Sequence, residues 1–203
     1  MQTLKEEIDN RILSAALNEF ERFGYAKSSM RRIAAEAGVT AGNIYRYYKG
    51  KEDLFQALIR PIYLQFMNLL LAIKAEVEAN LSELIGVPEQ MELVNSTLNR
   101  LITFLEETSK EAKILLTLSQ GSAFEHVKQE LTEIINQIFE NVMFYKQGDI
   151  GPKEKTAVAI LAATLTEGVC LTLQIVKERE QIRYAILELA AVFGAGLREK
   201  NKT

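Results

Sequence analysis

Apolar residues recur every three or four positions along almost all of this 203-residue chain, which is the spacing of one face of an α-helix. No segment alternates apolar and polar residues between hairpin turns, as a pair of β-strands would. The pattern therefore predicts an all-α fold of about nine helices. Taking capping residues, glycine and proline as boundaries, we expect helices at about residues 4–23, 30–37, 41–47, 52–78, 89–108, 109–119, 124–146, 153–179 and 182–200.

Proline and glycine interrupt this helical pattern at three places. Pro61 lacks an N–H and clashes with the preceding turn, so a bend or an interruption of the fourth helix is expected there. Gly86-Val87-Pro88 and the stretch from Gly148 to Pro152 are typical of loops between helices.

One short segment, residues 29–48, has the pattern of a helix-turn-helix and reads SMRRIAAEAGVTAGNIYRYY. A serine and Thr40 can cap its two short helices, and Gly38 can adopt the positive φ that a tight turn requires. Tyrosine hydroxyls bond phosphates and asparagine can read adenine edges. We expect the outer faces of the second short helix to carry Asn43, Tyr45, Arg46, Tyr47 and Tyr48.

The distribution of charge changes the picture of this region. The net charge of −3 by itself argues against a nucleic-acid partner. Between Arg22 and Lys51, however, there are seven Lys and Arg residues against one acid, Glu36. Such a local surplus favours binding of a polyanion. A basic surface that only faces solvent is the alternative that charge alone leaves open.

Residues 6–66 resemble the DNA-binding domain of the TetR family of one-component transcriptional regulators. The resemblance is carried by Gly24-Tyr25, by IAAEAGV, by the Gly-x-Ile-Tyr segment, by Tyr47-Tyr48 and by Lys-x-Lys-Glu-x-Leu-Phe. It implies a three-helix DNA-binding domain over residues 1–60, followed by a helical ligand-binding and dimerisation domain over residues 61–203. It also implies a repressor that binds a double-stranded DNA operator and is released by a small-molecule effector.

The resemblance further implies roles for single residues. Arg31 would contact a base or a phosphate, the start of the recognition helix would face the major groove, and Lys51 would neutralise a phosphate. Ala41 departs from the long polar residue that the family often has there, so it offers only an apolar contact. The expected DNA-binding residues are Arg31, Thr40, Ala41, Gly42, Asn43, Tyr45, Arg46, Tyr47 and Lys51.

The last two expected helices, at about 153–179 and 182–200, are rich in alanine and glycine. Small side chains let helices approach closely, and the resemblance implies that these helices pair with those of a second copy in a homodimer. Packing within one chain is the alternative. Apolar residues on several helices also predict a pocket for a largely apolar ligand, although they could instead fill a solid core. The polar residues expected at that pocket are Tyr63, Gln120, His126, Glu167 and Cys170.

With one cysteine and one histidine, the chain can form no internal disulfide and few catalytic constellations. It also lacks GxSxG, HExxH, phosphate-loop and dinucleotide motifs, so we expect no enzyme, cofactor or metal site. A helical interaction or dimerisation module without ligand sensing is the alternative to a regulator. The longest uncharged run, residues 61–73, falls short of the roughly 20 residues that span a bilayer, so we expect a cytoplasmic protein without a membrane partner.

Overall fold

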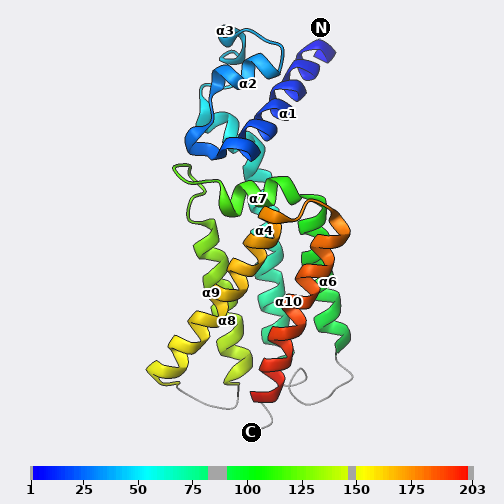
Figure 1. The fold of residues 1–203 in the computed structure, drawn as a ribbon, viewed down its shortest axis with the longest axis vertical. Coiled ribbons are helices and arrows are strands. Elements are labelled where there is room, and N and C mark those ends of the chain that lie inside the picture. The colour runs from blue at the N-terminus through cyan, green and yellow to red at the C-terminus, as the bar shows by residue number, and fades with distance from the viewer. Residues whose placement is uncertain (1, 82–90, 146–149, 201–203) are drawn as a thin grey trace. The chain divides into compact units, whose positions relative to one another are not determined.

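The computed structural model describes residues 2–81, 91–145 and 150–200, and within these ranges the chain is all-α (Figure 1). The all-α fold and the number of nine helices over the described ranges are confirmed. The expected loop at residues 86–88 lies outside them. The helices are α1 (Gln2–Lys27), α2 (Met30–Glu36), α3 (Ala41–Ile44), α4 (Lys51–Ala79), α6 (Met91–Glu107), α7 (Ser109–Thr117), α8 (Val127–Met143), α9 (Pro152–Ile175) and α10 (Arg179–Lys200).

Two of the expected boundaries are wrong at the N-terminal end. Gly24 leaves the helical region, with φ 71° and ψ 164°, but α1 resumes after this kink and continues to Lys27. The recognition helix α3 ends at Ile44, three residues earlier than expected. The reason is that the amides of Arg46 and Tyr47 bond to carbonyls three residues back, which tightens the chain into a turn.

The interruption expected at Pro61 does not occur, because α4 is continuous through this residue. A proline inside a helix leaves the carbonyl four residues earlier without its usual partner. Here both Pro61 and Ala57, which carries that carbonyl, are exposed, so water can bond the carbonyl. Ile59 and Phe66 are buried on either side of the proline and hold the helix in place by packing.

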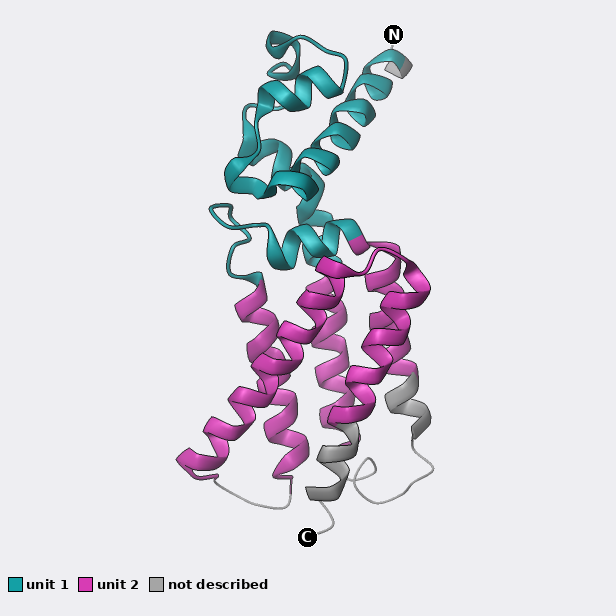
Figure 2. Cartoon of the chain, viewed as in Figure 1, with its two compact units in different colours: residues 1–65, 110–127 teal, residues 66–109, 128–203 magenta. Residues whose placement is uncertain are grey.

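The chain forms two compact units (Figure 2). Unit 1 consists of residues 1–65 and 110–127, and unit 2 consists of residues 66–109 and 128–203. Unit 1 therefore includes α7 from Lys110 onward and the turns after it, which the sequence assigned to the larger domain. The division into domains at residues 1–60 and 61–203 stays a prediction.

Aromatic side chains form the core of unit 1. The ring centroids of Phe20, Tyr25 and Phe55 lie 4.8–6.2 Å apart, and Phe124 extends this cluster at 6.1 Å from Phe55. The backbone N–H of Tyr25 donates to the carbonyl of Leu118 at 2.8 Å. Residues 110–127 are thus joined to the end of α1 by both packing and a main-chain hydrogen bond.

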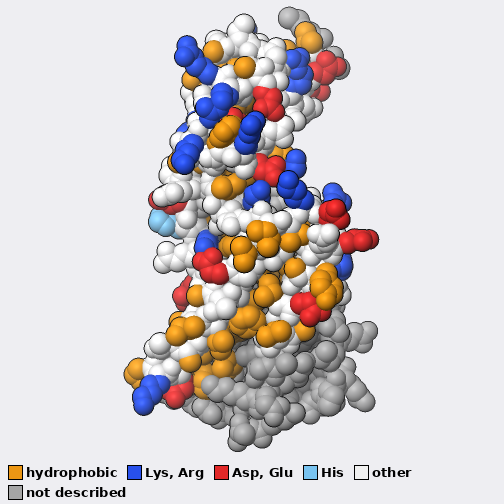
Figure 3. Space-filling model, viewed as in Figure 1, with side chains coloured by type: hydrophobic (Ala, Val, Ile, Leu, Met, Phe, Trp, Pro, Cys, Tyr) orange, Lys and Arg blue, Asp and Glu red, His pale blue; other side chains and the backbone are white. Residues whose placement is uncertain are grey.

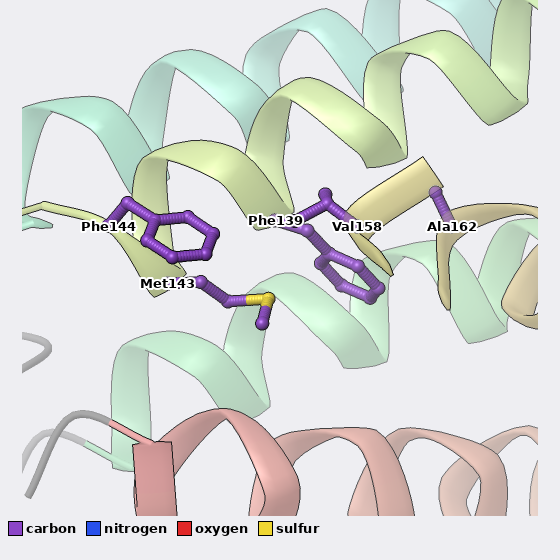
Figure 4. Packing of buried hydrophobic residues seen from close by; sticks show 5 residues of the cluster. All are labelled: Phe139, Met143, Phe144, Val158 and Ala162. Carbon is purple, nitrogen blue, oxygen red and sulfur yellow. The ribbon is translucent and has the colours of Figure 1, made fainter. Parts of the chain in front are cut away.

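Unit 2 is a helical bundle in which α10 packs against α6 and α9. A cluster of buried side chains joins α8 to α9 (Figure 4), and Phe193 of α10 stacks on one of its rings with centroids 5.9 Å apart. Gly168 of α9 leaves room for Leu189 of α10, since a Cβ there would meet the leucine methyls at 3.1 Å. The members of the cluster are Phe139, Met143, Phe144, Val158 and Ala162.

Two helices of the described ranges, α4 and α9, are long and apolar enough to cross a membrane by length and composition alone. Counting only uncharged runs did not reveal them, because charged residues interrupt the apolar stretch of each helix, Glu167 in α9 and Arg60 and Lys74 in α4. Core helices of soluble proteins pass the same test, and part of each helix is buried inside this protein. The absence of a membrane partner stays a prediction.

The conformation of Gly24 makes it a sensitive position for stability. In Gly24→Ala the new methyl would occupy a left-handed backbone position and lie 3.4 Å from the Leu118 carbonyl oxygen. We expect a loss of about 1–2 kcal/mol in the free energy of unfolding, measured as a lower midpoint of urea denaturation at an unchanged slope. Gly42→Ala is the matched control, because Gly42 has no positive φ and open space around it. Equal midpoints for Gly24→Ala and the wild type would contradict this assignment.

Candidate nucleic-acid interface

The start of α2 is held by a carboxylate on α1. The backbone N–H of Ser29, at the N-cap position, donates to Oε1 of Glu19 at 2.8 Å, whereas the Ser29 side chain makes no cap hydrogen bond. The N-terminus of a helix carries partial positive charge and unpaired N–H groups, so a carboxylate there satisfies both. The cap expected from a serine side chain is therefore supplied by Glu19, which lies ten residues earlier in the chain.

Glu19 also forms an ion pair inside the same unit. Its side chain is only 3% exposed, and its Oε1 accepts a hydrogen bond from Nε of Arg32 at 2.8 Å. A terminal nitrogen of the same guanidinium lies 2.5 Å from this oxygen as an ion pair. The hydrogen bond to Glu19 raises the pKa of Arg32. The guanidinium further lies over the ring of Phe23, 4.5 Å from its centroid. Arg32 therefore attaches α2 to α1.

The end of α2 is held by a second residue of α1. The Arg11 guanidinium donates to the carbonyls of Ala37 and Gly38, which are at the C-terminal end where helix carbonyls lack partners. Gly38 has φ 65° and makes the tight turn as expected. The Val39 N–H then returns to the carbonyl of Ala34 at 2.9 Å. Helix α1 therefore fixes α2 at both ends.

The recognition segment, residues 40–48, follows this turn. The Thr40 hydroxyl accepts from the N–H of Asn43 at 3.1 Å, so Thr40 caps α3 as predicted. Ile44 is fully buried. Tyr48 was expected on the outer face, and this is wrong: it is buried, and its hydroxyl donates to Oδ1 of Asp9 at 2.7 Å. Burial, with the bond to Asp9, raises the pKa of Tyr48.

The remaining predicted contact residues of the segment face outward. Asn43 and Tyr47 are partly exposed, and Tyr45 is 54% exposed. Within the described part of the chain, the side chains of Arg31, Asn43, Tyr45 and Arg46 make no hydrogen bond or ion pair, so they remain available to a partner. The exposed members of the predicted set are Arg31, Thr40, Ala41, Gly42, Tyr45 and Arg46.

Lys51 has a structural role that the sequence did not reveal. Its ammonium donates to the carbonyls of Tyr25 at 2.7 Å and Ala26 at 3.3 Å, in the last turn of α1. It also lies over the Tyr25 ring, 4.4 Å from the centroid. Burial and a hydrogen bond to Glu52 raise the pKa of Tyr25 to about 12, so this hydroxyl stays protonated. An ammonium has three donors, and one is left for a phosphate.

The five residues predicted for a ligand pocket are divided between the two units. In unit 1, the Tyr63 ring lies 5.3 Å from that of Phe124, while Gln120 and His126 are exposed. In unit 2, Glu167 is exposed and Cys170 is buried. That these five residues bind a ligand remains a prediction.

Cys170 packs inward from α9 as a small apolar residue. Burial raises the pKa of its thiol to about 11, with a further contribution from Glu167 that Lys128 opposes. The thiol is therefore protonated near neutral pH and is a poor nucleophile.

Sequence reasoning missed Asp9, Arg11 and Glu19, which hold the helix-turn-helix in place. A signal for Glu19 was present, since it falls three residues after Ala16 and one before Phe20, on the stripe of α1 that faces the core. A carboxylate on a buried stripe requires a cationic or hydrogen-bonding partner. The sequence pattern alone does not identify which of the nearby arginines is the partner of Glu19.

Comparison with known proteins agrees with this geometry. Residues 12–58 match the family model described as bacterial regulatory proteins, tetR family. The fatty acid metabolism regulator protein of Bacillus subtilis (strain 168) is 33% identical over 86 residues, a segment that covers 42% of this chain and only 41% of that protein.

Two solved structures are similar over nearly the whole chain. A TetR-like transcriptional regulator from Rhodococcus sp. RHA1 has a TM-score of 0.59 at 22% identity, covering 93% of this chain and 96% of its own. SmeT, the repressor of the Stenotrophomonas maltophilia multidrug efflux pump SmeDEF, has a TM-score of 0.52 at 17% identity, covering 91% and 89%. Residues 12–58 of this chain thus match the N-terminal segment of the tetR family of bacterial regulatory proteins, and the fold of the chain is similar to that of TetR-like regulators of known structure.

Proposed function

We propose that this protein is a DNA-binding transcriptional regulator that acts as a repressor and leaves its operator when a small, largely apolar ligand binds. One observation carries the proposal: the recognition segment is anchored on its inner side by Ile44 and Tyr48 and is polar, basic and exposed on its outer side. A rigid support with free donors on one face suits a surface that must fit the major groove.

The outward side chains divide into two kinds of contact. Asn43 offers an amide that can bond both polar atoms of an adenine edge, and Arg46 can bond a guanine or a phosphate. Tyr45 and Arg31 provide donors for the DNA backbone. Gly42 has no side chain and open space around it, which allows the backbone to come close to the DNA.

A homodimer through α9 and α10 is part of the proposal. Figure 3 shows hydrophobic side chains gathered over these two helices. Their small residues serve two purposes, since Ala162 and Gly168 pack within the chain whereas Ala157, Ala163 and Ala191 are exposed. Two-fold symmetry would give two recognition segments for a near-palindromic operator. The large exposed apolar residues of α9 and α10 in the described part of the chain are Ile160, Leu171, Ile175, Tyr184, Leu187 and Val192.

The proposed ligand is a small, largely apolar molecule bound within residues 61–180. The ring centroids of Phe66 and Phe104 lie 5.5 Å apart in a stacked arrangement in unit 2. Apolar walls with a few polar groups are typical of small-molecule sites. The names of two similar proteins, a regulator of fatty acid metabolism and a repressor of a multidrug efflux pump, are consistent with this class of ligand.

Neighbouring arginines on α2 give a matched test of DNA binding. Arg31→Ala removes an exposed guanidinium without a partner inside the described chain, so we expect an unchanged melting temperature and about tenfold weaker operator binding. The slope of log affinity against log salt should flatten by about one unit if Arg31 contacts a phosphate. Fluorescence anisotropy on duplexes selected from a random pool by the wild-type protein measures both quantities.

Arg32→Ala is the control for this experiment, because it leaves the buried Glu19 carboxylate without its ion-pair partner. We expect a melting temperature lower by a few degrees. If Arg31→Ala retains wild-type affinity and salt dependence, the exposed surface of α2 does not bind DNA. A wild-type protein that retains no duplex even at 50 mM KCl would instead favour an interaction module.

Regulation by a ligand is tested by linkage. Compounds of increasing alkyl chain length are screened for a rise in melting temperature, and each stabilising compound is then titrated into the protein–operator complex. We expect such compounds to weaken operator binding, and operator DNA to weaken their binding by the same factor, typically 5–150-fold. Compounds that stabilise the protein while operator affinity stays constant would reduce residues 61–203 to a dimerisation module.

A further inference from the structure

The recognition segment, residues 40–48, contains too little helix to hold its position unaided. Helix α3 has only four residues, and an isolated helix of this length is not stable in water. The Thr40 cap and the backbone bonds from Arg46 and Tyr47 to carbonyls three residues back give the segment its local shape. All of these bonds lie inside the segment, so they do not fix where it lies on unit 1.

Only two side chains of the segment are buried. Ile44 is fully buried and Tyr48 is 8% exposed, whereas the other residues of the segment are exposed or half-buried. Burial of an apolar side chain such as Ile44 has no preferred direction, so it attaches the segment without fixing its orientation. A hydrogen bond is directional, because the donor must point at the acceptor. Tyr48 makes such a bond.

The Tyr48 hydroxyl donates to Oδ1 of Asp9 on α1, 39 positions away in the chain, at 2.7 Å. In the described part of the chain, this is the only hydrogen bond or ion pair that joins residues 40–48 to another segment. Helix α2, by contrast, is joined to α1 through both Glu19 and Arg11. The orientation of the recognition segment therefore depends on one carboxylate, which lies outside the predicted DNA-binding set.

The chemistry of this bond makes it a durable one. Burial, together with the bond to Asp9, raises the pKa of Tyr48, so the hydroxyl remains a donor near neutral pH. A hydrogen bond to an ionised acceptor is also stronger than one between two neutral groups. The bond thus holds under the conditions in which DNA is bound.

Base contacts and phosphate contacts differ in the misplacement that they tolerate. Attraction between a cation and phosphates acts over several ångströms and carries no sequence information. A base contact needs its donor and acceptor within hydrogen-bonding distance, so a shift of about 1 Å weakens it. Asn43, the proposed base reader, lies five residues before Tyr48 in the same segment. A shift of the segment therefore affects discrimination between DNA sequences more than affinity for DNA in general.

We propose that Asp9 is a positioning residue for operator recognition, which acts by holding Tyr48 and so orients the recognition segment for base contacts by Asn43. The inference rests on the DNA-binding part of the proposed function. It adds a determinant of sequence discrimination that belongs to α1 and acts without contacting DNA.

The ratio of operator affinity to random-duplex affinity measures this role. Tyr48→Phe removes the donor and keeps the buried ring, and Asp9→Ala removes the acceptor. We expect each variant to lower the ratio about tenfold, while the slope of log affinity against log salt stays unchanged because no phosphate contact is lost. Fluorescence anisotropy gives both quantities, with a duplex selected from a random pool by the wild-type protein as the operator.

Two further variants separate the bond from the charge of Asp9. Asp9→Asn keeps a carbonyl oxygen as acceptor and should hold the ratio within about threefold of the wild type. The lost negative charge alters both affinities alike, so it cancels in the ratio. The double variant Asp9→Ala with Tyr48→Phe should have the ratio of either single variant, because both substitutions remove the same bond.

Another hydrogen bond of α1 provides the matched control. The Asn18 amide donates to Oε1 of Glu36 at 2.8 Å, a contact that joins α1 to α2 and does not reach the recognition segment. Asn18→Ala should therefore leave the ratio unchanged. Circular dichroism verifies the fold of each variant. If Asp9→Ala fails to fold, Tyr48→Phe decides the test, since it preserves the buried ring.

The outcomes separate this inference from the proposed function. A wild-type ratio in Tyr48→Phe overturns the role of Asp9 and leaves the DNA-binding regulator intact. A lower ratio in Tyr48→Phe but not in Asp9→Ala also overturns it, because the hydroxyl then acts through another group. So does a ratio in Asp9→Asn as low as that in Asp9→Ala. A wild-type protein without any preference for the selected duplex overturns the proposed function itself.

Discussion

The helix-turn-helix of this protein depends on how α1 holds both ends of α2. The buried Glu19 carboxylate binds the N–H at the start of α2, and the Arg11 guanidinium binds carbonyls at its end. Each charge has the sign that the corresponding end of the helix dipole favours. Because α3 begins only five residues after α2 ends, fixing α2 also determines where the recognition segment can lie. Ile44 and Tyr48 then attach that segment to the same core.

This arrangement sorts the basic residues of the region by role. Arg11, Arg32 and Lys51 bind carboxylate or carbonyl oxygens of unit 1. Arg31 and Arg46 have no such partner within the described residues and face outward. The surplus of positive charge read from the sequence therefore overstates what is free for DNA. It also includes Arg32 and Lys51, which help to make the surface rigid, and a pre-organised surface loses less entropy on binding.

Helix α9 is apolar on both of its sides, and this explains several features together. Val158, Ala162 and Cys170 face the core of unit 2, while Ile160 and Leu171 face outward. A helix that is hydrophobic all round is usually buried all round. The same composition makes α9 apolar enough to cross a membrane by length and composition alone. A partner surface that covers the outer side accounts for this composition without a membrane.

The sequence by itself determined the all-α class, the approximate helix ranges and the helix-turn-helix motif, since each follows from spacing and from local signals such as Gly38 and Thr40. It did not determine that α4 would continue through Pro61 or that Tyr48 would turn inward. Nor did it separate Arg31 from Arg32, which are adjacent in the chain and identical in type. The tertiary structure decided the roles of Tyr48 and Arg32 because each depends on a group elsewhere in the chain, Asp9 for Tyr48 and Glu19 for Arg32. It decided the course of α4 through the burial of Ile59 and Phe66 on either side of the proline. A local pattern records the period of a helix, but it carries no information about which distant side chain will lie within hydrogen-bonding distance.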